Sequence, residues 1–212
     1  MKRLYLFFIM CVFVQVSNSQ QAVDLGLSVK WATCNVGASS PEDYGDYYAW
    51  GETEKKSSYD WKSYKWCKGS SSSMTKYCTS SSYGTVDNKT VLDPEDDVAH
   101  VKWGGSWRMP TWVEQYDLHE NCIWTWMTQN GTKGYKVTSK LNGNSIFLPA
   151  AGYRYDSSLG YAGSDGFYWS SSLGGYDDGC ACILCIKSES ITSVFVYHIR
   201  SVGNSVRPVW SE

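Results

Sequence analysis

The sequence has no surplus of basic charge and no second long apolar run. Its 212 residues carry 19 Lys and Arg against 21 Asp and Glu, for a formal net charge of −2. Such a chain has no basic field to attract nucleic acid, so we expect no nucleic-acid partner. Beyond the N-terminal segment no apolar run is long enough to span a bilayer, so we expect no transmembrane segment.

Histidine is also scarce, which limits acid–base and nucleophilic catalysis. The chain contains only His100, His119 and His198, and no spacing joins one of them to an acid as a catalytic pair. A nucleophilic thiol needs a base beside it. We therefore do not expect an enzyme, and the sequence implies no cofactor.

The N-terminal segment has the pattern of a secretory signal peptide. A basic pair precedes the apolar run Leu4–Val16, which is too short to span a bilayer comfortably, and small residues follow it. We expect cleavage of residues 1–19 and a single domain at 20–212, exported to the periplasm, the cell surface or the medium. The alternatives are a buried N-terminal helix and a lipoprotein anchored at Cys11, although little hydrophobic sequence precedes Cys11.

The cysteines outside the signal peptide are odd in number. They are Cys34, Cys67, Cys78, Cys122, Cys180, Cys182 and Cys185. At least one thiol is therefore free or pairs between chains. Cys67 and Cys78 flank a Ser-rich loop and could form a disulfide. Zinc bound by the last three cysteines and His198 is an alternative, but their spacing matches none of the usual zinc motifs.

Two segments carry helix signals. Asp93-Pro94-Glu95-Asp96 places an N-cap residue and a proline before acidic residues, which predicts a helix over Pro94–Lys102. Thr111 and Glu114 form a capping box, which predicts a second helix over Trp112–Asn121.

The remaining chain alternates short apolar runs with turn residues, which favours an α+β fold with antiparallel sheets and long loops. Asn142-Gly143 predicts a hairpin turn between Val137 and Ile146. We expect strands at Lys30–Asn35, Asp46–Trp50, Thr125–Met127, Tyr135–Ser139, Ser145–Pro149, Gly152–Arg154, Gly166–Ser171, Ala181–Ile186, Ser193–Ile199 and Val206–Val209.

Six motifs occur in a fixed order between residues 23 and 209. They are Gly26–Ala32 (GLSVKWA), Gly45–Glu52 (GDYYAWGE), Gly105–Thr111 (GSWRMPT) with Glu114, Leu148–Gly152 (LPAAG), Gly166–Ser172 (GFYWSSS) and Ser205–Val209 (SVRPV). The combination resembles the Fibrobacter succinogenes major paralogous domain family of exported bacterial proteins. That family is similar to the formylglycine-generating-enzyme branch of the C-type-lectin-like fold, so the resemblance implies this fold, with two short helices.

We expect the charged residues of these motifs to have structural roles. We expect Arg108 and Arg207 to form ion pairs or to cap carbonyl groups, and Glu52 and Glu114 to be partners or caps rather than catalysts. The calcium-binding triplets of sugar-binding C-type lectins, Glu-Pro-Asn or Gln-Pro-Asp and Trp-Asn-Asp, are absent. Calcium bound by Asp93–Asp97 is an alternative, although the helix start already explains these acids. We expect no metal.

The last part of the chain avoids five residue types. Gly174–Ile186 and Ile191–Val202 contain no Trp, Met, Lys, Glu or Gln. C-type-lectin-like folds also carry the variable proteins of diversity-generating retroelements, in which copying errors at adenines turn Asn codons into other codons ending in C or T. Those codons specify none of the five missing types. In addition, Val194–Ile199 lacks the alternation of a half-buried strand, although a plain buried strand pair would also explain it.

The candidate variable region is therefore 174–202, with Lys187–Ser190 as an unmutated spacer. Fixed scaffold positions are expected at Ala181, Leu184, Ile186, Ile191, Arg200 and Gly203. Exposed ligand-binding positions are predicted at Tyr176, Asp177, Cys180, Cys182, Ile183, Cys185, Val194, Phe195, Val196, Tyr197, His198, Ile199, Ser201 and Val202.

These features predict an adhesin-like protein that displays a diversified surface to an unknown protein or glycan ligand. The first alternative is a generic exported paralogous domain with a structural or carbohydrate-binding role. The second is an oxidase resembling the formylglycine-generating enzymes, which use a cysteine pair near the end of the fold.

The flanking DNA tests the diversification hypothesis. We expect a nearly identical second copy of the 3′ end of the gene, in which the codons for Cys182, Cys185, Phe195, Tyr197 and His198 read as Asn. A reverse-transcriptase gene should lie nearby. Sequencing the locus decides the matter, and a locus without such a copy contradicts the hypothesis.

Overall fold

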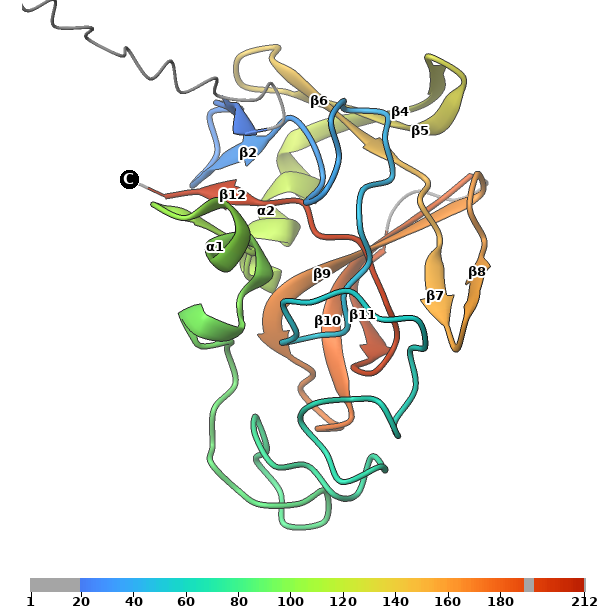
Figure 1. Ribbon diagram of the computed structural model, residues 1–212. Helices are drawn as coiled ribbons and strands as arrows, with labels where there is room; N and C mark the ends of the chain where they lie inside the picture. The colour runs from blue at the N-terminus through green and yellow to red at the C-terminus, as the bar shows by residue number, and fades with distance from the viewer. Residues whose placement is uncertain (1–19, 189–192, 212) are drawn as a thin grey trace, which may run out of the picture.

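Two helices and four small antiparallel sheets make up an α+β fold in the computed structural model, which describes residues 20–188 and 193–211 (Figure 1). The predicted signal peptide lies outside the described residues. The sheets have the strand orders β1-β2-β12-β3, β4-β5-β6, β7-β8 and β11-β10-β9. The strands are β1 (Ala22–Val23), β2 (Lys30–Ala32), β3 (Trp107–Arg108), β4 (Cys122–Gln129), β5 (Thr132–Ser139), β6 (Ser145–Pro149), β7 (Tyr153–Tyr155), β8 (Ser158–Gly160), β9 (Asp165–Leu173), β10 (Cys180–Lys187), β11 (Ser193–Ile199) and β12 (Val209–Trp210).

The first predicted helix is divided in two. Pro94–Asp96 forms a 3-10 turn (η2), and α1 spans Val98–Trp103. The backbone of Asp97 between them is extended, because its carboxylate turns back to accept hydrogen bonds from the first backbone N–H groups of α1. The predicted range is correct to within one residue, but a continuous helix is not formed.

The second helix is confirmed at its predicted bounds. α2 spans Trp112–Asn121 and begins with a complete capping box. The Thr111 side chain accepts from the Glu114 N–H, and the Glu114 carboxylate accepts from the Thr111 N–H at 2.7 Å. These reciprocal bonds satisfy two donors that a helix N-terminus otherwise leaves unpaired.

Most predicted strands are present, and the predicted hairpin is formed. β5 and β6 pair with Val137 opposite Ile146, on either side of the Asn142-Gly143 turn. Gly143 adopts a φ of +77°, a left-handed conformation that costs glycine little.

The strand predicted at Asp46–Trp50 is wrong. Only Tyr48 forms an isolated bridge, to Asn204, and the Trp50 N–H donates to the carbonyl of Arg200. Alternate side chains of this segment are buried in two clusters, as in a strand, but its backbone N–H groups donate to separate partners, Val36, Asn204 and Arg200. The last predicted strand is also shifted, because β12 covers Val209–Trp210 rather than Val206–Val209.

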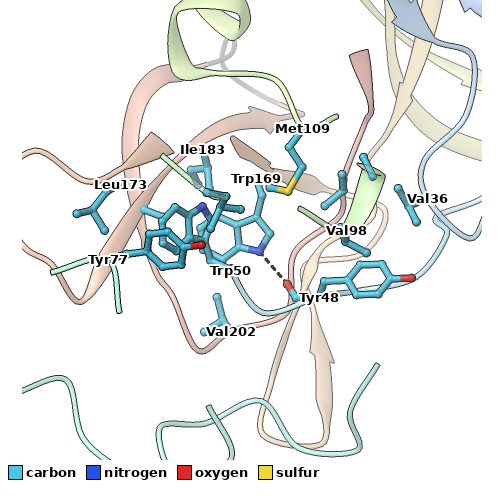
Figure 2. Packing of buried hydrophobic residues seen from close by; sticks show 14 of the residues in the cluster. Val36, Tyr48, Trp50, Tyr77, Val98, Met109, Trp169, Leu173, Ile183 and Val202 are labelled. Carbon is cyan, nitrogen blue, oxygen red and sulfur yellow. Dashed lines mark hydrogen bonds between the residues drawn. The ribbon is translucent and has the colours of Figure 1, made fainter. Parts of the chain in front are cut away.

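The sheet β11-β10-β9 separates two hydrophobic clusters. Trp169, Ala181 and Ile183 face the cluster that contains Trp50, as Figure 2 shows in part. Tyr168, Leu184 and Ile186 face the opposite cluster, which also contains Leu118 of α2. The central strand β10 is therefore covered on both faces.

The motif arginines have the structural roles expected for them. Arg108 forms a bidentate ion pair with Glu114, with one N···O distance of 2.8 Å. Arg207 is 1% exposed and has a carbonyl-capping role. It donates to the side-chain oxygen of Asn35 and to the backbone carbonyls of Ala32, Thr33 and Phe147. Burial lowers the pKa of Arg207 to about 10, so it stays charged at neutral pH.

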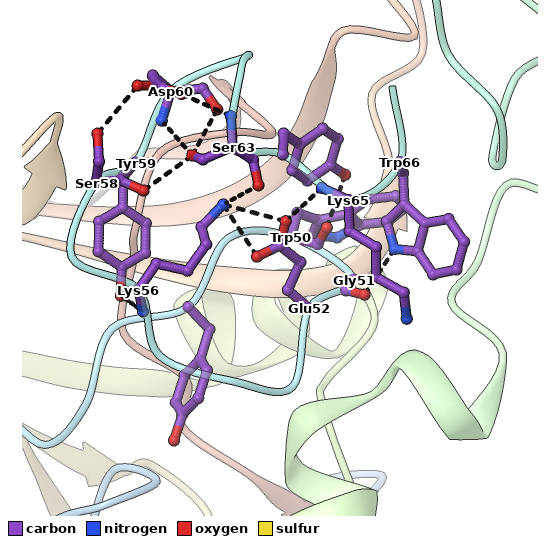
Figure 3. A network of polar contacts seen from close by, with 12 residues as sticks. Trp50, Gly51, Glu52, Lys56, Ser58, Tyr59, Asp60, Ser63, Lys65 and Trp66 are labelled. Carbon is purple, nitrogen blue, oxygen red and sulfur yellow. Dashed lines mark hydrogen bonds and ion pairs between the residues drawn. The ribbon is translucent and has the colours of Figure 1, made fainter. Parts of the chain in front are cut away.

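Glu52 also has its expected role as a partner, in the polar network of Figure 3. It pairs with the ammonium group of Lys56 at 3.0 Å and accepts the Lys65 N–H at 2.7 Å. These contacts shape the loop that follows Glu52.

Arg207→Met should lower the free energy of unfolding by about 3–5 kcal/mol, because three buried carbonyl groups and Asn35 lose their donors together. Arg207→Lys should recover only part of this loss, since an ammonium group lacks the planar fork of donors. Urea titration followed by tryptophan fluorescence measures both variants. A loss below about 1 kcal/mol for Arg207→Met would contradict the role given to this side chain.

Candidate functional site

Strand β11 exposes alternate side chains of the candidate variable region. Tyr197 is 38% and Ile199 is 40% exposed, whereas Val196 and His198 between them are half-buried. The strand thus has the alternation of a half-buried strand, which its sequence does not show. The predicted positions Val194 and Phe195 have side chains outside the part of the chain that the structure describes, and Ile191 lies outside it altogether.

A second exposed aromatic residue lies beside this strand. Tyr176 is 89% exposed in the turn between β9 and β10, and its ring meets the Tyr197 ring edge-on at 6.3 Å between centroids. Gly175 leaves room beside the Tyr197 hydroxyl, which would lie 3.5 Å from a Cβ at that position. Asp177 is exposed and Cys180 is half-buried next to it. These residues form an open polar and aromatic surface, here called the β11 surface and comprising Tyr176, Asp177, Cys180, Tyr197 and Ile199.

Five predicted ligand-binding positions are wrong as exposed positions. They are Cys182, Ile183, Cys185, Ser201 and Val202, and their exposure ranges from 1% to 7%. Sheet order explains the three on β10, because this strand lies between β9 and β11 with both faces covered. Ser201 and Val202 follow Arg200 into the interior, where Val202 packs in the cluster of Trp50. The scaffold positions Ala181, Leu184, Ile186 and Arg200 are buried as expected.

The three clustered cysteines are protonated thiols at neutral pH. Burial raises the pKa of Cys180, Cys182 and Cys185 to about 11, and the carboxylate of Asp177 contributes to this at Cys180. The Cys182 thiol donates to the carbonyl of Leu173 at 3.3 Å. A thiol of this kind is a poor nucleophile and a poor metal ligand.

The cysteines of the described residues are all free. The disulfide considered possible between Cys67 and Cys78 is therefore not formed. Each thiol donates to a backbone carbonyl instead, Cys67 to Trp61 and Cys78 to Ser80, both at 3.2 Å. Backbone hydrogen bonds close the Ser-rich loop without a cross-link.

The acidic segment considered for calcium already holds a cation from the chain itself. Asp93, Glu95 and Asp96 place carboxylate oxygens within 4.8 Å of one another. The ammonium group of Lys76 lies 2.6 Å from both Asp93 and Asp96. Desolvation lowers the pKa of Lys76, but its hydrogen bonds to these two carboxylates outweigh this and raise it. The lysine thus neutralises part of the negative charge of this segment.

His198 lies on the face of β11 opposite Tyr197. Its ring stacks on Phe167 at 5.2 Å and meets Tyr153 edge-on at 4.8 Å, and its Nδ1 is hydrogen-bonded to Asn204. Burial lowers the pKa of His198 more than the bond to Asn204 raises it. The imidazole is therefore neutral at physiological pH, and it faces aromatic rings rather than an acid.

One pocket next to the β11 surface was not expected from the sequence. It has a volume of about 360 Å³ and is lined by the segments 60–62 and 155–156 together with Gly69, Ile199 and Ser201. These segments are distant in sequence, so no local pattern indicated that they meet.

Among the described residues, no helix combines the length and apolarity that crossing a membrane requires. No family model matches the chain, and neither the curated proteins nor the solved structures contain a significant match.

The protein should lose stability as the pH is lowered through about 6.5, because the unfolded chain protonates His198 more readily than the folded chain does. His198→Gln should flatten the free energy of unfolding between pH 7.5 and 5, measured by urea titration at each pH. If the free energy of unfolding of His198→Gln falls with pH as steeply as that of the unchanged protein, His198 is not the cause of the pH dependence.

Proposed function

We propose that the protein is an exported ligand-binding protein that displays exchangeable side chains on a C-type-lectin-like scaffold. The observation that carries the proposal is the β11 surface itself. Tyr197 and Ile199 project from β11, which pairs with β10 along one edge, and Tyr176 projects from the adjoining turn. None of the three takes part in a buried cluster. Such side chains can change without loss of the fold.

The composition of this surface suits recognition. Tyrosine provides a large, rigid contact area at a small cost in conformational entropy and retains a polar hydroxyl. Two tyrosines in edge-on contact, with an isoleucine and a carboxylate nearby, form a mixed patch of the kind that binds a protein or glycan surface.

Burial narrows the set of positions that could be diversified. Retroelement copying would be tolerated at Tyr176, Asp177, Cys180, Tyr197 and Ile199. Substitutions at the buried positions of β10 would create cavities or overpacked contacts. The avoidance of five residue types in Gly174–Ile186 and Ile191–Val202 supports diversification, and the exposed subset is where it would act.

The state of the thiols disfavours an oxidase. Such a mechanism requires an accessible thiolate, whereas the pKa of each clustered cysteine is raised to about 11. Cys182 and Cys185 are also buried, and a substrate cannot reach them without opening of the sheet.

Substitutions at the β11 surface should affect the free energy of unfolding much less than a substitution in the central strand β10. Tyr176→Ala, Tyr197→Ser and Ile199→Asn should each change the free energy of unfolding by less than about 1 kcal/mol, as at most surface positions. Ile183→Ala should cost about 2–4 kcal/mol, because it leaves a cavity in the cluster around Trp50. Urea titration of all four variants compares them directly.

A ligand-binding role adds a second requirement. A library randomised at Tyr176, Tyr197 and Ile199 should yield binders to unrelated proteins when it is displayed and selected, and a library randomised at the exposed residues Lys133 and Lys136 of β5 serves as the control. Unfolding of most members of the first library would rule out an exchangeable surface there. Equal yields of binders from the two libraries would show that the β11 surface is no better suited to ligand binding than the surface of β5.

A further inference from the structure

The pocket beside the β11 surface is built from preorganised walls. Tyr59 and Asp156 exchange backbone hydrogen bonds at 3.0 and 3.1 Å, which join the loop before the pocket to the β7–β8 hairpin. The Tyr59 hydroxyl donates to the carbonyl of Tyr47 at 2.6 Å. A Cβ at Gly203 would lie 2.7 Å from the Tyr59 ring, so the ring fits only against glycine. A site held in this way loses little entropy when it binds a ligand.

The pocket contains two carboxylates of different kinds. Asp60 accepts the Ser63 N–H at 2.7 Å and the Ser58 hydroxyl at 3.0 Å, as Figure 3 shows, and the first of these bonds is the main reason that its pKa is lowered. It is therefore an oriented anion. The carboxylate of Asp156 has no hydrogen bond or ion pair with any residue of the described chain, and its backbone adopts a left-handed φ of 49°. It is available to a ligand.

Aromatic and apolar groups complete the lining. Trp61, Tyr155 and Ile199 belong to the lining, and Tyr155 is 54% exposed. Lys62 is the one cationic residue in the lining, so the carboxylates outnumber it by two to one. Aromatic faces beside carboxylates attract an organic cation both through the ring quadrupoles and through the net negative charge.

We propose that this pocket binds an ammonium group, carried by a small amine or by a lysine side chain of a protein ligand. The volume of about 360 Å³ lies within the range of small-molecule sites. The bound cation pairs with Asp156, which lacks a partner in the chain, and contacts the rings of Trp61 and Tyr155. The site depends on the β11 surface only through Ile199, so the two proposals can fail separately.

Isothermal titration of residues 20–212 with choline and with Nα-acetyl-lysine methylamide tests the proposal. Saturable binding of either probe is expected, and the stronger one identifies the quaternary or the primary ammonium as the preferred group. Asp156→Asn should weaken binding about tenfold, because it removes the carboxylate that faces the cation. Asparagine also tolerates the left-handed conformation, so this variant should fold. Lys62→Gln should strengthen binding, and Glu120→Gln, on the distant helix α2, should change nothing.

The neutral isostere 3,3-dimethyl-1-butanol separates charge from shape. It should bind at least tenfold more weakly than choline, and added salt should weaken choline binding. Equal affinity for the isostere, tighter binding of a neutral hexose, or an Asp156→Asn variant with unchanged affinity would overturn the proposal. Circular dichroism of each variant excludes unfolding as the cause of any loss.

Discussion

Buried guanidinium groups hold together segments that have little regular secondary structure of their own. Arg200 is fully buried and donates to the hydroxyl of Tyr64 and to the carbonyls of Lys76, Tyr77 and Asp178. Its guanidinium also lies 4.8 Å from the centre of the Trp50 ring. Long loops expose many carbonyl groups that no strand or helix satisfies, and a planar fork of donors can satisfy several of them at once. This side chain therefore attaches the loops at Tyr64 and at Lys76 and Tyr77 to the end of β11, in addition to the backbone bond from Trp50 to the Arg200 carbonyl.

This anchoring explains how the side chains of the β11 surface can be exposed while the backbone that carries them is held in place. Arg200 follows Ile199 directly, so the end of β11 is fixed from beneath by the arginine and from the side by β10. Figure 1 shows the loops of residues 52–91 gathered at the same end of the molecule. The β11 surface and the adjoining pocket therefore share one rigid base, while the side chains of Tyr197 and Ile199 contribute nothing to that base.

Local signals predicted α2 and the hairpin correctly and located the first helical segment, because capping groups and turn residues act within a few positions of the chain. They did not predict the break of that segment at Asp97. The capping box of Thr111 determined α2 to the residue. The exposure of candidate site residues depends on strand order, which no local pattern encodes. Cys182 and Cys185 lie in a strand that is central in its sheet, and this makes them core residues. The pocket near Asp156 could not be predicted either, since its walls meet only through tertiary contacts.

Comparison of this gene among closely related cells tests the central claim most directly. If the protein presents an exchangeable surface on a fixed scaffold, nonsynonymous differences should concentrate in the codons of Tyr176, Asp177, Cys180, Tyr197 and Ile199. The codons of Leu184, Arg200 and Arg207 should show no nonsynonymous differences. Differences spread evenly along residues 20–211, or differences that replace Arg200, would contradict the account.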